Sequence, residues 1–330
     1  MSQSSLDSAL AAGAFIVTPN NRLAREIVLQ FDAARVAAGE RAWAPAQALP
    51  WAIWVERLWL TASAARATPQ VALLDASASR ELWHVVVARD LPALVNTRGA
   101  ARHAAEAWTL FHAWRELGES VERVAAECGD DDARCFAAWA DTFAQRVNAL
   151  AAVDHAQLPD LLAASASASW ARGVGRVVVY GFLALTPQQR RLIHALRDAG
   201  MVIDEMRADE KRARRRHQVT CATPSLELAD AFAFARARIT TEPRSRIAIV
   251  VADLEVRRDE VVALAEETLC PERLLELAPD APRPYDLSLG EPLGGVPIVA
   301  CALDLIALAG GELEATAAAA VMRAPFLPEA

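Results

Sequence analysis

Lysine is nearly absent from this chain of 330 residues. Arginine supplies all but one of the 34 basic side chains, and the exception, Lys211, follows Glu210. A phosphate loop of the GxxxxGK[ST] type requires a lysine directly after a glycine, because that lysine contacts the phosphates of the bound nucleotide. The chain therefore has no Walker A motif of its own.

Clustered metal ligands are missing as well. The five cysteines are scattered and form no CxxC pair, and the six histidines do not occur at metal-ligand spacing. Zinc sites and iron–sulfur clusters need such spacing, so we expect reduced, mostly buried thiols and structural histidines. A GxSxG nucleophile elbow is also absent. The sequence predicts no catalytic residue, no metal ligand and no bound cofactor.

Long apolar runs do not occur. No segment approaches the roughly 18 apolar residues that a membrane span needs. The first dozen residues lack the basic start and the apolar core of a secretory signal. Because 54% of the residues are hydrophobic and 23% charged, the composition is that of a globular protein. We expect a cytoplasmic location and no membrane partner.

The net charge of −8 argues against a surface that is basic overall, but it leaves room for a local basic groove. The one basic cluster is "RADEKRARRRH", in which six of eleven residues are arginine or lysine. It is either a solvated linker between domains or a contact to DNA phosphates through Arg214, Arg215 and Arg216. No aromatic residue interleaves it, so stacking on bases is not indicated.

The tryptophans divide the chain into two parts. All nine lie in the first 170 residues, which indicates different architectures before and after that point. Between about residues 50 and 150 the apolar residues recur with a helical period. For example, "WAIWVERLWL" places Trp51, Trp54 and Leu58 on one helix face. This region predicts a bundle of four or five helices.

Capping residues predict where helices of this bundle begin and end. Ser77 or Ser79 is expected to cap the helix in "SASRELWHVVVARD". An apolar stripe as far as Leu117 predicts a helix that stops at Gly118. Asp130 is expected at the start of another helix, because the positive end of the helix dipole favours anions.

Strands and helices alternate in the rest of the chain. "RVVVYGF" is a continuous β-branched run, typical of a buried parallel strand. "LTPQQRRLIHALRDAG" predicts a helix with Thr186 as its N-cap. We expect parallel strands near residues 14–18, 176–181, 201–205 and 246–251. The pattern indicates a layered α/β sheet, with the helical region inserted between the first two strands.

The segment "FIVTPNNRLAREI" reads as a strand, a turn and a helix that opens on Arg22. Nucleotide-binding proteins keep their phosphate loop at such a junction. Here the turn is "TPNN", which contains neither glycine nor lysine. The junction therefore requires another role.

Together these segments resemble the superfamily 1 helicase-like part of bacterial AddB/RecB-type recombination proteins. More closely, the chain is similar to the proteobacterial "probable DNA repair protein" family, which joins such a region to a C-terminal PD-(D/E)XK nuclease. "VTPNNRLAREI" resembles the motif Ia segment, and "VVVYGFLALTPQQRRLIHAL" resembles the Walker B strand and the helix after it. "ELADAFAFARARI" and "DLSLGEPLGGVPIVACALDLI" resemble the opening of the second helicase domain.

The resemblance implies a P-loop NTPase-like α/β fold, in which a parallel sheet carries a large all-helical insertion and is followed by the start of a second α/β domain. Residues 1–205 would form helicase-like domain 1, with the insertion at about residues 50–170. Residues 206–330 would form the beginning of domain 2, cut short. Mg²⁺ is expected only for a nuclease domain that this chain does not include.

The resemblance also bears on catalysis. In active helicases the Walker B strand ends in "DE", which supplies the magnesium ligand and the base that activates water. Gly181 and Phe182 stand at that place, and neither side chain can coordinate a metal or accept a proton. The resemblance therefore implies a helicase-like region without motor activity.

The resemblance to motif Ia implies a DNA contact, to a single strand or a duplex end. Thr18 and Asn20 would present polar groups at the end of the first strand, and the next helix would offer its N-terminal amides and Arg22 to a phosphate. A purely structural alternative has Asn20 capping the helix and Arg22 pairing with Glu26.

Three functions are compatible with these observations. The first is an inactive helicase-like scaffold of a DNA repair or recombination nuclease, which contributes DNA binding. The second is a protein-interaction module whose tryptophan-rich helical part docks a helicase or nuclease partner. The third, an active helicase, would need a phosphate loop supplied from elsewhere.

Overall fold

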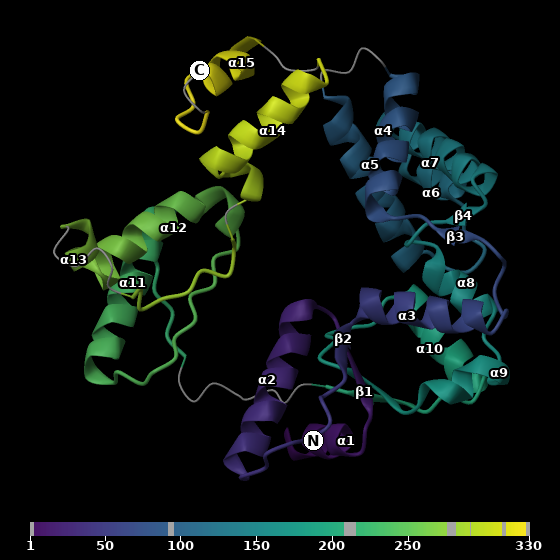
Figure 1. The fold of residues 1–330 in the computed structure, drawn as a ribbon, viewed down its shortest axis with the longest axis horizontal. Coiled ribbons are helices and arrows are strands. Elements are labelled where there is room, and N and C mark those ends of the chain that lie inside the picture. The colour runs from purple at the N-terminus through teal and green to yellow at the C-terminus, as the bar shows by residue number, and fades with distance from the viewer. Residues whose placement is uncertain are drawn as a thin grey trace. The chain divides into compact units, whose positions relative to one another are not determined.

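The protein divides into two compact units, Met1–Arg212 and Ala213–Ala330, each described here by itself (Figure 1). The sequence placed this boundary a few residues earlier, at 205. The structure, a computed structural model, describes residues 3–91, 96–207, 216–275, 282–290, 292–311 and 315–327. None of the helices in these stretches has both the length and the apolar content that a membrane crossing requires.

A four-stranded sheet with the order β2-β1-β5-β6 forms the centre of the first unit. All its neighbouring strands are parallel, with Ile16 opposite both Ala48 and Val178. The sequence predicted the three strands near 14–18, 176–181 and 201–205 but not the edge strand at Ala48–Pro50. The four strands are β1 (Phe15–Thr18), β2 (Ala48–Pro50), β5 (Val177–Tyr180) and β6 (Ile203–Met206). The first unit is therefore an α/β structure.

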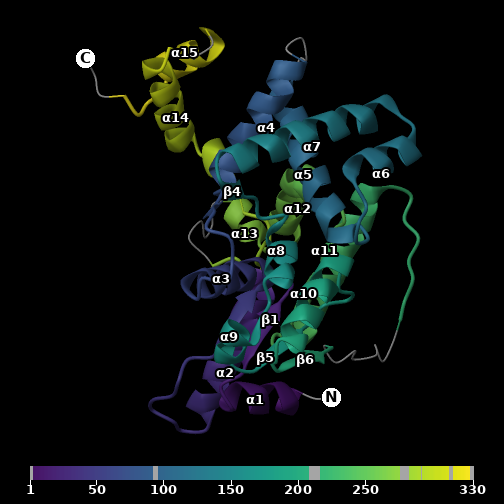
Figure 2. The same ribbon diagram turned by 90° about the vertical axis from the view of Figure 1, so that its right-hand side faces the viewer.

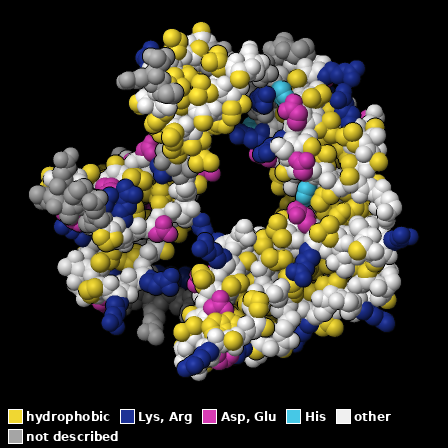
Figure 3. All heavy atoms as spheres, viewed as in Figure 1, with side chains coloured by type: hydrophobic (Ala, Val, Ile, Leu, Met, Phe, Trp, Pro, Cys, Tyr) yellow, Lys and Arg dark blue, Asp and Glu magenta, His cyan; other side chains and the backbone are white. Residues whose placement is uncertain are grey.

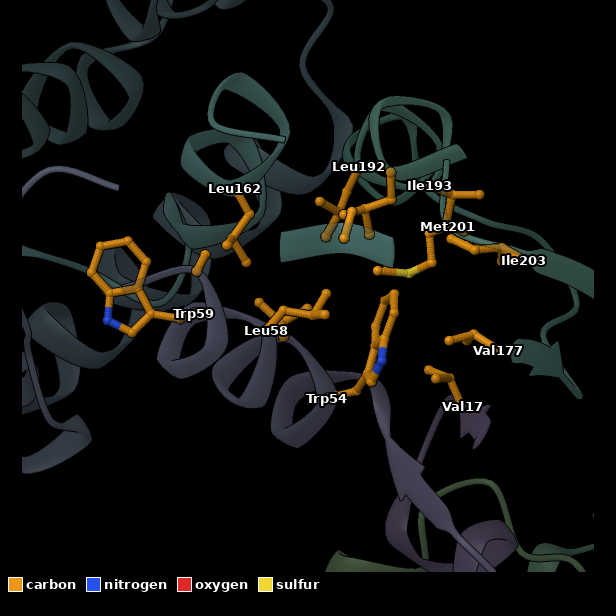
Figure 4. Close-up of a cluster of buried hydrophobic side chains, with 14 of the residues drawn as sticks. Val17, Trp54, Leu58, Trp59, Leu162, Val177, Leu192, Ile193, Met201 and Ile203 are labelled. Carbon is orange, nitrogen blue, oxygen red and sulfur yellow. The ribbon is translucent and has the colours of Figure 1, made fainter. Parts of the chain in front are cut away.

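Helices cover both faces of this sheet because its central strands, β1 and β5, are apolar at most positions. Val17 and Val177 face a core that includes Trp54 of α3, whereas Ile16 and Val178 face the core of α1 and α2 (Figure 4). Alternate residues of a strand point to opposite faces, so a continuous apolar run suits a strand buried on both. The covering helices are α1 (Gln3–Ala11), α2 (Asn21–Ala37), α3 (Trp51–Ala64), α8 (Leu158–Ala164), α9 (Ala168–Ala171) and α10 (Pro187–Asp198).

The helical insertion has a core of its own, which Figure 2 shows as a group of packed helices. Trp83 stacks on Phe143 with ring centroids 4.1 Å apart, and Trp108 packs edge-on against both rings. The helices of the insertion are α4 (Ala76–Asp90), α5 (Thr97–Trp114), α6 (Val121–Cys128) and α7 (Asp131–Ala149). Helix α3 packs on the sheet, so this second core begins later than residue 50.

Three expectations for the insertion were wrong. The region is not wholly helical, because β3 (Ala72–Leu73) pairs in parallel with β4 (Ala152–Val153) where the two ends of the insertion meet. Helix α4 is capped by Asp75 in place of a serine, since its carboxylate accepts hydrogen bonds from the backbone N–H groups of residues 77 and 78. Helix α5 ends at Trp114, which leaves Leu117 outside it and 81% exposed.

A half-buried carboxylate joins the insertion to the sheet layer. Asp160 of α8 accepts hydrogen bonds from Arg115 Nη2 at 3.1 Å and from Arg191 Nη2 at 3.1 Å. Gln188 Nε2 donates to the same carboxylate at 3.1 Å, and His112 Nδ1 lies 3.8 Å away, too far for a hydrogen bond. Since Arg115 follows α5 while Gln188 and Arg191 belong to α10, Asp160 connects three helices.

The second unit is helical in its described residues, which contain no strand. The expected strand at 246–251 has no regular secondary structure and pairs with no described segment, so this part of the predicted second α/β domain was wrong. Figure 3 shows hydrophobic side chains gathered over α14 and α15, where Ile298 and Ile306 are exposed. The helices are α11 (Pro224–Thr241), α12 (Leu254–Leu269), α13 (Pro271–Leu274), α14 (Pro297–Ala309) and α15 (Ala315–Met322).

Candidate nucleic-acid interface

The chain reverses its direction of travel across the sheet between β1 and β5. From β1 it crosses through α2 to β2 on one side, whereas β5 lies on the other side and leads through α10 to β6 further out. In open α/β sheets, ligands bind outside the carboxyl ends of the strands at such a switch point. The candidate site is therefore where β1 ends at Thr18 and β5 ends at Tyr180.

Thr18 lies at this edge but does not face a ligand. Its side chain is fully buried, and its hydroxyl donates hydrogen bonds to Asn20 O at 2.9 Å and Leu49 O at 3.3 Å. The residue holds the turn after β1 against the neighbouring strand. The expectation that Thr18 presents its hydroxyl group to DNA is corrected accordingly.

Asn20 and Arg22 are exposed at the start of α2. Asn20 Oδ1 accepts a hydrogen bond from the backbone N–H of Leu23 at 2.9 Å, so Asn20 is the N-cap, as the structural alternative predicted. A capping side chain occupies one of the amides that would otherwise be offered to a phosphate. Arg22 remains on the first turn, where a cation at the surface can approach a phosphate oxygen.

The side chain of Leu23 lies against the backbone of Gly181 at the end of β5. Gly181, directly after β5, has a φ of +80°, and a Cβ atom placed on it would lie only 2.5 Å from Leu23 Cδ2. A phosphate site needs open backbone amides and complementary charge. At this switch point a leucine side chain abuts the backbone, and neither Gly181 nor Phe182 offers a carboxylate for magnesium. The arrangement disfavours a bound triphosphate.

Apolar side chains form the rim of the site. Phe182 packs edge-on against Trp51, with ring centroids 6.2 Å apart. The next residue, Leu183, is 99% exposed. Apolar groups of this kind, placed beside a strand-end crevice, are suited to contact flat rings or apolar side chains.

A cavity of about 540 Å³ lies between α3, α4, α5 and the N-terminal end of α10. His155 Nε2 and Glu56 Oε1 are 3.1 Å apart on its wall, and both side chains are half-buried. Asp154 is buried beside them and accepts hydrogen bonds from Ser79 Oγ at 2.9 Å and Trp108 Nε1 at 3.2 Å. These bonds fix the wall of the cavity in position.

A second cavity, of about 730 Å³, continues from the first along α4 and α5, since both are lined by Arg80 and Thr109. Arg98 and Arg102 also line it, one helical turn apart. All three arginines are exposed. We call the two cavities together the insertion groove. The groove combines these cations with carboxylates, among them Glu106, which pairs with Arg102 at 3.9 Å, and it has a tryptophan at the end nearer to the sheet.

The arginine cluster between the two units adds little evidence for a DNA-binding site. Arg214 and Arg215 lie outside the described residues, and Arg216 is exposed in the second unit. The sequence interpretation did not find Arg80, Arg98 and Arg102. The spacing of Arg98 and Arg102 places them on one helix face, but only the packing of α4 against α5 brings Arg80 to the same groove.

The side chains that could bind a metal ion are not clustered in the described residues. Among the described residues, no group of three or more histidine, cysteine, aspartate or glutamate side chains is arranged to hold a metal ion. Comparison of the chain with protein-family models gives no match, and comparison with curated proteins gives none either.

Proposed function

We propose that this chain is an inactivated, superfamily 1 helicase-like scaffold that binds DNA within a repair or recombination nuclease. The observation that carries the proposal is the closed switch point. A doubly wound parallel sheet normally binds its ligand there, yet Leu23 abuts Gly181 and no carboxylate follows β5. A parallel sheet with a switch point, combined with the absence of a Walker A sequence, favours binding over motor activity.

The insertion groove supports DNA as the ligand. Exposed arginines contact phosphates without reading sequence, and each neutralised phosphate releases counterions. Arg80, Arg98 and Arg102 line one stretch of the groove, and Trp51 lies at the end nearer to the sheet. Cations followed by an aromatic ring are the groups that bind the backbone and bases of a single strand.

Fluorescence anisotropy with a labelled single strand of about 20 nucleotides tests the proposal. We expect binding that weakens about twentyfold as salt rises from about 50 to about 200 mM, as three phosphate contacts to a single strand would give. The double variant Arg98→Ala/Arg102→Ala should bind more weakly and with a shallower salt dependence. Arg22→Ala tests the helix α2 contact in the same way.

The matched control is Arg123→Ala/Arg134→Ala, which removes the same charge from exposed positions that do not line the groove. It should bind nearly as the unaltered protein does. Absence of binding even at low salt, or an equal loss in the control and the groove variant, would contradict a specific nucleic-acid site.

A protein-interaction function is the second candidate, and the exposed end of α5 favours it. Trp114 is 57% exposed, with Leu110 and Leu117 exposed nearby in sequence. Most of the other tryptophans belong to cores, so the tryptophan-rich composition itself is explained by packing. The buried ones are Trp54, Trp59, Trp83, Trp108 and Trp170. A Trp114→Ala variant that keeps DNA affinity but loses a nuclease-complex partner would assign this surface to docking.

A further inference from the structure

Residues 245–251 of the second unit have the burial pattern of a strand in a two-layer structure. Ile247, Ile249 and Val251 are half-buried, whereas Ala248 and Val250 between them are exposed, Val250 to 92%. Ile249 and Val251 pack against the core formed by α11 and α12. Alternation with a period of two, with one face on a helix layer, is the pattern of a half-buried β-strand.

The backbone of this segment lacks the partner that a strand requires. Within the described part of the chain, no backbone N–H or C=O group of residues 246–251 takes part in a hydrogen bond. Extended backbone with unpaired donors and acceptors is a template for pairing with another extended chain.

A second segment outside any helix or strand packs on the same helices through Tyr285 and Leu287. Tyr285, Leu287 and Leu289 are half-buried and alternate with exposed residues. Tyr285 Oη donates a hydrogen bond to Glu266 Oε1 of α12 at 2.9 Å, which anchors this segment. Burial and that hydrogen bond raise the pKa of Tyr285 to about 12, so its phenol stays protonated and donating at neutral pH.

A largely apolar cavity of about 500 Å³ lies between these two segments and the helices. Residues 245–249 and 284–288 line its sides, and α11 and α12 supply apolar side chains such as Phe232 and Val261. Strands in a sheet lie about 4.8 Å apart, with alternate side chains entering the core. The cavity therefore has the parts of a strand site: backbone hydrogen-bonding groups along a side and an apolar surface below.

We propose that residues 245–251 form a docking edge for an extended peptide of a partner protein, bound by strand addition between this segment and residues 284–288. The peptide carries apolar side chains at alternate positions, which enter the cavity over α11 and α12. Main-chain hydrogen bonds to residues 246–251 provide affinity, and the alternating side chains provide specificity. The role is separate from DNA binding, since every residue involved belongs to the second unit.

Charge adds a requirement on the partner. Arg244 and Arg246 are exposed at the beginning of the edge, and neither forms an ion pair within the described residues. The peptide therefore carries acidic residues at the end that lies beside them. A second copy of this chain is a poorer occupant, because its own Ile249 and Val251 are already packed on α11 and α12.

The test uses the whole chain and a fluorescent synthetic peptide, with valine and threonine in alternation and two aspartates at one end. We expect saturable binding by anisotropy. The same peptide with alternate backbone amides N-methylated should bind about tenfold more weakly or worse, because it loses main-chain donors and keeps every side chain. A peptide of scrambled order should also bind more weakly.

Two protein variants complete the test. Val250→Pro removes a backbone donor from the edge, whereas Val250→Ala keeps the backbone and should bind as the unaltered chain does. Arg246→Glu should weaken the acidic peptide and favour one that ends in lysines. Equal binding of the N-methylated peptide would overturn strand addition. If the unaltered chain forms dimers and Val250→Pro dissociates them, the edge binds a second copy of the chain, and the peptide proposal is overturned.

Discussion

The contact between Leu23 and Gly181 determines what the end of the sheet can hold. Gly181 adopts a φ of +80°, which side chains rarely tolerate, and its missing Cβ leaves room for Leu23. We expect Gly181→Ala to lower the free energy of unfolding by more than about 1–2 kcal/mol, because the left-handed conformation alone costs about this much and the contact with Leu23 adds to it. Chemical denaturation measures the change.

Gly129→Ala is the matched control for this substitution. Gly129 has a similar φ of +76°, but nothing lies within 4 Å of its missing Cβ, so only the backbone cost applies. The additional loss of unfolding free energy in Gly181→Ala, relative to Gly129→Ala, measures the contact with Leu23. This difference should disappear when Leu23 is also replaced by alanine. Equal costs for the two alanine variants would show that Leu23 does not close the switch point.

Asp160 is the most strongly perturbed carboxyl group in the first unit. Its burial alone would raise its pKa, but His112, Gln188 and Arg191 around it outweigh that effect and hold the pKa far below the usual 3.8. The folded state thus favours the ionised form, so this carboxylate stabilises the protein at pH values above about 4. The contribution is lost as the pH falls below that value.

We expect Asp160→Asn to destabilise the protein by roughly 3 kcal/mol at neutral pH, because Arg115 and Arg191 lose their shared counter-ion. The variant should also lose part of the acid dependence of stability between about pH 5 and pH 2. Thermal unfolding across this range measures both. Asp141→Asn, at an exposed position, is the control; an identical pH profile for the two variants would contradict the role of Asp160.

Helix ends show which parts of an element follow from local sequence. Thr186 was predicted as the N-cap of α10, and its hydroxyl accepts a hydrogen bond from Gln189 N at 3.2 Å. Gln189 Oε1 in return accepts one from Thr186 N, which completes a capping box. Thr186→Ala should cost about 1 kcal/mol in thermal or chemical unfolding, and Thr186→Ser should restore most of it. A loss that serine does not restore would indicate packing of the methyl group.

The end of α5 could not be predicted in the same way. The apolar pattern continues to Leu117, but the helix stops at Trp114, and the carbonyl of Arg115 accepts a hydrogen bond from Arg191 Nη1 at 2.9 Å. That partner lies 76 residues further along the chain. The local sequence pattern predicts that a helix forms. The residue at which it ends coincides with a contact to a residue distant in the sequence.

Strands differ from helices because their backbone groups need a partner elsewhere. β1, β5 and β6 were predicted correctly, and each pairs with neighbours in the same unit. Residues 247–251 form a similar apolar run, but no described segment pairs with them. Sequence alone therefore predicts the propensity for a strand and not the sheet that would complete it.

At the scale of the molecule, composition excluded a phosphate loop but could not show what replaces it. The single lysine, Lys211, decides the absence of a Walker A motif. The closure by Leu23 and the insertion groove depend on contacts between elements. Arg80 lies in α4 and Arg98 in α5, and packing brings them to one groove. The sequence pattern predicts where the strands of the sheet end. It does not predict which side chains from other elements lie beside those ends.

The closed switch point is the central claim, and titration of the whole chain with ATP and Mg²⁺ in a calorimeter tests it most directly. We predict no saturable heat at ATP concentrations up to about 1 mM, where a micromolar site would be filled. Stoichiometric binding with a micromolar dissociation constant would contradict the account, because it would require Leu23 to move away from Gly181 and a phosphate site that the turn TPNN does not provide.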